Sequence, residues 1–212
     1  MTFNSSARQR LRHPYEPGEP FVIAKHATTS APILDTLTER WSPRAYDADH
    51  ALTEGELRGV FEAARWSPSG SNSQPWRFII ARRGSESFAK VEATLMPGNA
   101  AWANTAAAFI VNLAVNQNSD GQPMRWAEYD LGQAVAHLSV QAHSEGLYVH
   151  QMGGFDPQAL SEAFGLDATL TPVTIATIGK RGTPDQLPEP LKERELAPRT
   201  RLSLEEIIVV ND

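Results

Sequence analysis

Two stretches of this chain are almost uninterrupted runs of apolar residues, and they constrain the fold more than any other feature. Residues 108–115 (AFIVNLAV) and 173–179 (VTIATIG) are each about as long as one strand. A strand buried on both faces has this continuous apolar character, whereas a half-exposed strand alternates between apolar and polar residues. We therefore expect a sheet whose two faces are both covered, with helices as the covering layers.

Several other segments have the spacing of helices. Thr53 and Glu56 form a capping box, and Asp156-Pro157 is an N-cap followed by proline at the first helical position. Pro97-Gly98 is expected to end one helix, and Gly146 and Gly165 to end two others. The predicted helices cover residues 33–41, 54–66, 88–95, 126–145 and 157–164.

The order of these segments predicts an α+β protein. Residues 76–82 (WRFIIAR) add a further strand, and we expect about four strands in all. The spacing is too uneven for a regular βαβ repeat, so an α+β sandwich of strands wrapped by helices is expected. The 212 residues suit one domain over 31–212, preceded by an irregular N-terminal arm over 1–30. The proline-rich segment 183–201 is expected to cross a surface, which could belong to a second subunit.

Composition excludes several classes of function. Nineteen basic and 25 acidic residues give a net charge of −6, which argues against a nucleic-acid partner. The chain has no cysteine, so disulfides, thiolate zinc sites and cysteine nucleophiles are excluded. His137 and His143 are six residues apart and do not share a helical face, so no metal site is expected. No apolar run is long enough to span a membrane, and we expect a soluble cytoplasmic protein.

Three polar segments could carry chemistry. Residues 67–76 (SPSGSNSQPW) are small residues with hydroxyl, amide and backbone N–H groups, which a flat polar ligand can approach closely. Residues 40–44 (RWSPR) and 199–201 (RTR) each hold two guanidiniums, which can bind a phosphate through paired hydrogen bonds. Each segment also has a plainer interpretation, as an ordinary turn or as solvated charge. Dinucleotide-binding and phosphate-loop glycine motifs are absent from the sequence.

Taken together, these segments resemble the FMN-dependent nitroreductase-like flavoproteins. Residues 40–46 (RWSPRAY) are similar to the family element R-x-S-x-[RK]-x-[FY]. Residues 64–80 (ARWSPSGSNSQPWRFII) resemble A-x-x-[AS]-P-S-x-x-N-x-Q-P-W-x-F, and 152–156 (MGGFD) resemble a Gly-Phe-Asp element. The resemblance runs from about residue 33 to residue 210. It implies a nitroreductase-like sandwich with a central, mostly antiparallel sheet wrapped by helices, in an intertwined homodimer with two FMN molecules at the interface.

The resemblance also implies which residues hold the phosphate end of FMN. By position, Arg40 and Ser42 would bind the phosphate, and Arg199 and Arg201 would close on it from the tail. Arg44 would face the N1 and O2 edge of the flavin. A fixed positive charge at that edge favours the reduced cofactor, whose added negative charge lies there.

The ring end of the cofactor would be held largely by neutral groups. Asn99 corresponds to an amide near the pyrimidine ring, and the backbone of Gly153 and Gly154 would offer an N–H to flavin N5. Residues that cover the flavin face are expected within 94–126. The partner subunit would contribute Pro68, Ser69 and Asn72.

The function that this resemblance implies is that of an FMN-dependent NAD(P)H oxidoreductase. It would reduce nitroaromatics, quinones or related electron-poor small molecules by ping-pong hydride transfer. The flavin carries the chemistry, so no side chain is expected to be catalytic. Two alternatives stay open: another flavin chemistry such as enal or semialdehyde reduction or dehalogenation, and a non-catalytic flavin-binding protein.

Overall fold

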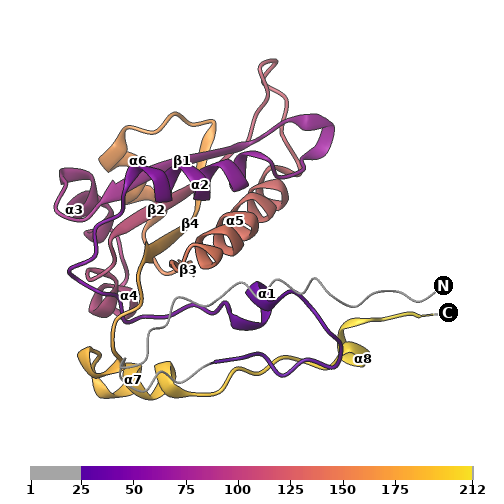
Figure 1. Cartoon of the computed structure of the whole chain (residues 1–212). Coiled ribbons are helices and arrows are strands. Elements are labelled where there is room, and N and C mark those ends of the chain that lie inside the picture. The colour runs from indigo at the N-terminus through magenta and orange to yellow at the C-terminus, as the bar shows by residue number, and fades with distance from the viewer. Residues whose placement is uncertain (1–24, 212) are drawn as a thin grey trace.

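A four-stranded antiparallel sheet forms the centre of the protein (Figure 1). The computed structural model describes residues 25–211, so most of the predicted N-terminal arm lies outside the described residues. The strand order is β1-β2-β4-β3, and every neighbouring pair is antiparallel. The strands are β1 (Trp76–Arg82), β2 (Ala108–Val115), β3 (Tyr148–Met152) and β4 (Leu170–Gly179).

Helices cover the sheet and extend beyond one edge of it. Six of them have seven or more residues: α2 (Glu54–Arg65), α3 (Glu86–Glu92), α4 (Pro97–Ala103), α5 (Ala127–Ser144), α6 (Pro157–Phe164) and α7 (Glu189–Leu196). The short elements are α1 (Asp35–Glu39), α8 (Leu204–Ile207), η1 (Gly70–Asn72) and η2 (Pro184–Gln186).

Strand β2 is buried on both faces, as its composition predicts. Phe109 and Val111 point into one apolar cluster, which includes residues of α3 and α4. Ile110, between them, points into a second cluster formed with α2 and α5. Alternate residues of a strand point to opposite faces, so the sheet separates two cores. The predicted α+β sandwich is therefore confirmed.

The helix ends that were predicted from capping residues are also confirmed. Thr53 and Glu56 form the reciprocal capping box that begins α2. The Asp156 side chain accepts hydrogen bonds from two backbone N–H groups at the start of α6. Gly165 has φ 57° at the end of that helix, a left-handed conformation that favours glycine.

Other element predictions are wrong. Pro97-Gly98 does not follow directly on the preceding helix: α3 ends at Glu92, and Pro97 is the first residue of a new helix, α4. Proline is favoured at that position because its missing N–H would have no partner in the helix. Strand β3 and helix α7 were not predicted; α7 lies inside the proline-rich segment that is expected to cross a surface.

The predicted helix over 33–41 is much shorter and does not bury its apolar face. It covers only Asp35–Glu39, and none of its residues is buried. Leu34 and Leu37 are exposed, as are the apolar residues near the C-terminus. Figure 1 shows α1, α7 and α8 in a layer set apart from the sheet, along one side of the molecule.

Candidate functional site

The segment after α1 is extended, and this sets the direction of its polar side chains. Trp41 and Pro43 are buried, whereas Arg40, Ser42 and Arg44 are only half-buried. Alternate residues of an extended chain point to opposite sides. The two arginines and the serine of the first motif therefore share one side, while Trp41 and Pro43 anchor the segment to the core.

His150 of β3 fixes this extended segment. Its Nδ1 lies 2.8 Å from the carbonyl oxygen of Pro43, to which it donates a hydrogen bond. Burial, with added repulsion from Arg44 and Arg40, lowers the pKa of His150 to about 4. The imidazole is therefore neutral near pH 7 and acts as a hydrogen-bond donor that holds the extended segment between the two arginines.

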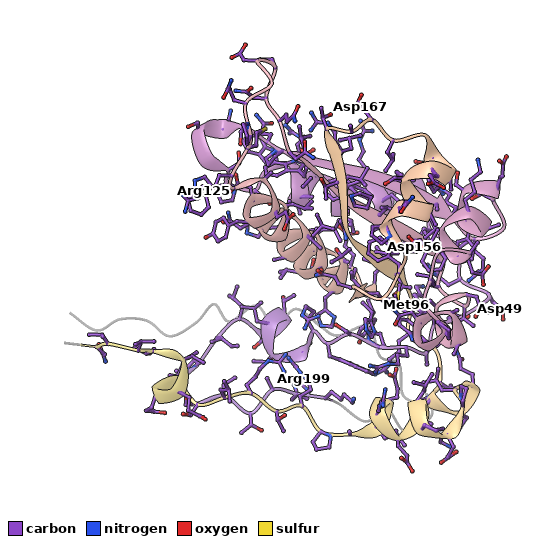
Figure 2. All side chains as sticks on the ribbon, turned by 180° about the vertical axis from the view of Figure 1, so that it is seen from behind. Asp49, Met96, Arg125, Asp156, Asp167 and Arg199 are labelled. Atoms are coloured by element: carbon purple, nitrogen blue, oxygen red, sulfur yellow. The ribbon has the colours of Figure 1, made fainter. Side chains whose placement is uncertain are left out.

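The C-terminal segment after α7 returns to the same region. One guanidinium nitrogen of Arg199 donates to the carbonyl oxygens of Lys25 at 2.9 Å and Thr38 at 2.6 Å. Figure 2 shows Arg199 beside α1, between the two chain segments. Residues from the two ends of the described chain are thus joined by direct hydrogen bonds.

Three guanidiniums meet at this junction. Burial lowers the pKa of Arg40, and the positive charges of Arg199 and Arg201 lower it further. The pKa of Arg199 is lowered in the same way, by burial and by Arg201. We call Arg40, Arg199 and Arg201 the guanidinium cluster. Like charges held together repel one another, and a phosphate that accepts hydrogen bonds from several of them relieves that repulsion.

Arg44 has a partner that the sequence did not reveal. The carboxylate of Glu195 in α7 accepts hydrogen bonds from the backbone N–H of Arg44 at 2.9 Å and of Ala45 at 3.2 Å. The guanidinium of Arg44 lies 3.8 Å from the same carboxylate. The expected cation at the flavin edge is therefore paired with a buried carboxylate, whose pKa burial raises.

Asn99 and Gly154 lie together at the end of β3. The amide nitrogen of Asn99 donates to the carbonyl oxygen of Gly154 at 2.9 Å, and the N–H of Met96 donates to the same oxygen at 3.0 Å. A Cβ atom built on Gly154 would lie 2.8 Å from that amide nitrogen. Glycine at this position thus permits the close approach of Asn99, while Gly153 faces open space.

The loop over residues 67–74, which we call the serine loop, has a strained backbone. Ser71, Asn72 and Gln74 have positive φ values of 52°, 55° and 47°. Such left-handed conformations are unfavourable for residues with a Cβ and are concentrated at functional sites. The hydroxyl of Ser69 supports the loop by accepting a hydrogen bond from the N–H of Gln74 at 3.0 Å.

Two side chains of helix α5 hold the serine loop through hydrogen bonds. The buried carboxylate of Asp130 accepts a hydrogen bond from the N–H of Gly70 at 3.0 Å. About two turns further along the same face of the helix, His137 Nδ1 lies 2.7 Å from the hydroxyl of Ser67. A cavity of about 260 Å³ lies between loop and helix, lined by Pro68, Ser69, Gly70, Trp126, Tyr129, Asp130 and Gln133. Asp130 therefore positions this loop.

The candidate residues thus fall into separate groups within one chain. Arg40, Ser42, Arg44, Arg199 and Arg201 lie around the junction of α1 and the C-terminal segment. Asn99, Gly153 and Gly154 form a second group beyond β3. Among the described residues, no hydrogen bond or ion pair joins Pro68, Ser69 or Asn72 to either group. In Figure 1 the serine loop, between α2 and β1, lies at the opposite end of the molecule from α4 and α7.

Residues 25–211 contain neither a cluster of metal-ligating side chains nor a membrane-spanning helix. In that part of the chain, no group of three or more histidine and acidic side chains could hold a metal ion. None of its helices is long and apolar enough to cross a membrane.

Comparison with known proteins agrees with the fold. The model of the "Nitroreductase family" matches residues 37–180. An uncharacterised 15.4 kDa protein of Mycolicibacterium smegmatis is 34% identical over 139 residues, which are 62% of this chain and 92% of that protein. An oxygen-insensitive NAD(P)H nitroreductase of Enterobacter cloacae is 41% identical over 49 residues, 23% of each chain.

A solved structure is similar over nearly the whole described chain. It is that of an FMN-containing oxidoreductase, with 30% sequence identity and a TM-score of 0.82. The similarity covers 88% of this chain and 96% of that one. The chain therefore belongs to the nitroreductase family, and it is an oxidoreductase.

Proposed function

We propose that this protein is an FMN-dependent NAD(P)H oxidoreductase that reduces electron-poor small molecules such as nitroaromatics or quinones. The family match and the similar FMN-containing structure make FMN its cofactor. When bound, FMN would supply the hydride-transfer chemistry between NAD(P)H and the acceptor, which would bind in alternation. The residues of the chain bind and orient the reactants.

The observation that carries this proposal is the guanidinium cluster. Arg40 is separated from Arg199 and Arg201 by about three quarters of the chain, yet all three charges act on one another. In an acidic protein with a net charge of −6, such a concentration of positive charge needs a specific anion. The terminal phosphate of FMN is a dianion that fits this donor set.

The other groups suit the ring end of the cofactor. Arg44 and Ser42 share the exposed side of the first motif with Arg40, so they would continue the site from the phosphate towards the flavin. Asn99 and the open backbone at Gly153 would contact the polar edge of the ring. Their task is to orient a planar ligand and to exclude water from it.

We also propose that the protein acts as a homodimer. Helices α1 and α8 bury none of their residues against their own chain. Val209 and Val210 are 94% and 69% exposed, and Ile207 and Ile208 beside them are also exposed. A contiguous apolar segment of this kind marks an interaction surface. A second copy would cover it and would bring its own serine loop to the flavin.

The proposal is tested by the cofactor content of the purified protein. We expect a yellow protein that retains FMN or takes it up with one FMN for each chain. Under anaerobic conditions, NADH or NADPH should bleach the flavin absorbance, and addition of a quinone or nitroaromatic should restore it.

Each alternative function gives a different result. Bound FMN that NADH and NADPH fail to reduce would support a non-catalytic flavin-binding protein. Reduction without turnover of nitroaromatics or quinones would favour another flavin chemistry on the same fold. A colourless monomer that takes up no FMN would contradict the whole proposal.

A further inference from the structure

Glu195 is a buried carboxylate that the proposed flavin chemistry does not use. Its side chain is 2% exposed, although it belongs to the charged helix α7. A buried carboxylate is unfavourable unless hydrogen bonds and opposite charges compensate for its lost hydration. The structure provides both hydrogen-bond donors and positive charges around this carboxylate.

The first partners are in the motif that contains Arg40. Glu195 accepts hydrogen bonds from the backbone N–H groups of Arg44 and Ala45, and the guanidinium of Arg44 lies 3.8 Å away. One carboxylate thus satisfies two backbone donors and partly neutralises a cation. Because Glu195 lies four residues before Arg199, the same contact also fixes where the C-terminal segment leaves α7.

Lys25 links Glu195 to the guanidinium cluster. Burial lowers the pKa of Lys25, and the charges of Arg44 and Arg199 lower it further, whereas Glu195 opposes this shift. The ammonium group lies 4.3 Å from the centre of the Trp41 ring and 3.4 Å from the carbonyl oxygen of Arg194. The carbonyl oxygen of Lys25 accepts from Arg199. Glu195 and Arg199 of the cluster therefore both act on the charge of Lys25.

The sign of the effect of Glu195 depends on whether an anion is bound. Without a ligand, the cations repel one another, and the carboxylate offsets part of that repulsion. With a phosphate dianion bound, the same carboxylate is a like charge and is repulsive. A single side chain then offsets cation repulsion in the ligand-free protein and lowers its affinity for the ligand.

We propose that Glu195 is the built-in counter-charge of this site, which offsets the repulsion among its cations in the ligand-free chain and weakens their binding of phosphate groups. The inference rests on the proposed function, since it takes the phosphate of FMN as the physiological anion. It makes Glu195 a residue that tunes cofactor affinity through charge, beyond its structural role in holding the turn at Arg44.

The test is the Glu195→Gln variant, with inorganic phosphate, FMN and riboflavin as probes. Glutamine keeps an oxygen that can accept from the N–H groups of Arg44 and Ala45, but it removes the charge. We expect phosphate to stabilise the variant more than it stabilises the wild-type protein. Phosphate and FMN should bind about threefold to tenfold more tightly, whereas riboflavin affinity should not change.

Two matched variants separate charge from structure. Glu193→Gln removes the same charge from an exposed position of α7 and should leave phosphate affinity unchanged. Glu195→Asp keeps the charge but shortens the side chain, so it should lose stability without any gain in phosphate affinity. Structural damage weakens binding, so only removal of a repulsive charge explains a gain.

Several outcomes would overturn the inference. They are weaker or unchanged phosphate and FMN binding by a folded Glu195→Gln variant, no phosphate binding by the wild-type protein, and a variant that stays unfolded in saturating phosphate. Wild-type protein that binds phosphate but not FMN would refute the proposed function and leave the counter-charge intact. Normal FMN-dependent turnover, with FMN affinity unchanged in Glu195→Gln, would support the proposed function and refute the counter-charge.

Discussion

The guanidinium cluster and the serine loop are the two most unusual regions of this molecule, and they are built in opposite ways. The cluster gathers like charges from two segments that lie far apart in the chain. The serine loop carries no charged side chain, and its strained backbone is held by hydrogen bonds to α5. Charge thus defines one region, and backbone shape defines the other.

This difference indicates what each region can recognise. A cluster of cations favours any suitable anion, and its contribution depends on the charge of the ligand and on salt. A rigid loop of small residues offers hydrogen bonds in fixed positions and discriminates by shape. Together they would recognise a ligand with a phosphate at one end and a flat polar ring at the other, as FMN has.

The largest effect is expected from Arg40→Ala, which would break the charged region. Loss of a charged hydrogen bond removes about 1.5–3 kcal/mol, so FMN should bind about tenfold to hundredfold more weakly. Riboflavin lacks the phosphate, and its affinity should change little. Flavin fluorescence quenching measures both constants. The exposed Arg58→Ala is the matched control, and equal losses for FMN and riboflavin would contradict the phosphate assignment.

A pH titration should test how His150 holds the segment between Arg40 and Arg44. The pKa of His150 is lowered from 6.5 to about 4 in the folded protein, so the unfolded chain takes up a proton first as the pH falls. Stability contributed by the neutral imidazole is complete above pH 6.5 and is lost between about pH 6.5 and 4, by about 3 kcal/mol. Urea unfolding at several pH values measures it.

The His150→Gln variant is the control for this titration, since glutamine can still donate to the Pro43 carbonyl but does not titrate in this range. We expect the part of the pH dependence that comes from His150 to disappear. A wild-type slope that persists in the variant would show that other groups cause it.

Gly154→Ala should damage the shape-dependent part of the site. The added Cβ would lie 2.8 Å from the amide nitrogen of Asn99, so Asn99 must move and its hydrogen bond to Gly154 weakens. A loss of about 1 kcal/mol would reduce FMN and riboflavin affinity by the same factor of about five. Gly98→Ala, where nothing lies within 4 Å, is the control. A loss confined to FMN would contradict this division of the site.

The smallest effect is expected from Asp130→Ala at the serine loop. Removal of the carboxylate frees the N–H of Gly70, which is exposed enough to bond to water, so about 1 kcal/mol of stability is lost. Hydrogen exchange of residues 69–74 should speed up. Asp130→Asn, which keeps an acceptor, should restore most of the protection. Unchanged exchange in Asp130→Ala would show that α5 does not hold the loop.

Much of the fold could be predicted because its signals are local. The apolar run at 108–115 and the caps at Thr53 and Asp156 depend on neighbouring residues, and the structure has them as expected. Strand β3 has a mixed sequence, and its place in the sheet is set by pairing with β4. The pattern at 33–41 indicates an apolar face, but nothing in the pattern says that the chain itself leaves this face exposed.

The residues of the candidate site also divide into those that the sequence indicates and those that only the folded chain reveals. Arginines stand out in the sequence of an acidic protein, so Arg40, Arg199 and Arg201 could be singled out, although their roles stay predictions. Glu195 could not, because a glutamate in a charged helix has the appearance of a solvated residue. Its importance comes from a contact with Arg44, 151 residues away, which only the folded chain brings about.

The most direct measurement compares the affinity of the wild-type protein for FMN and for riboflavin at physiological salt. Three guanidiniums on one phosphate should make FMN bind at least about a hundredfold more tightly. The ratio of the two dissociation constants should fall towards one in Arg201→Ala. Equal affinities in the wild-type protein would contradict the assignment of the cluster to the cofactor phosphate.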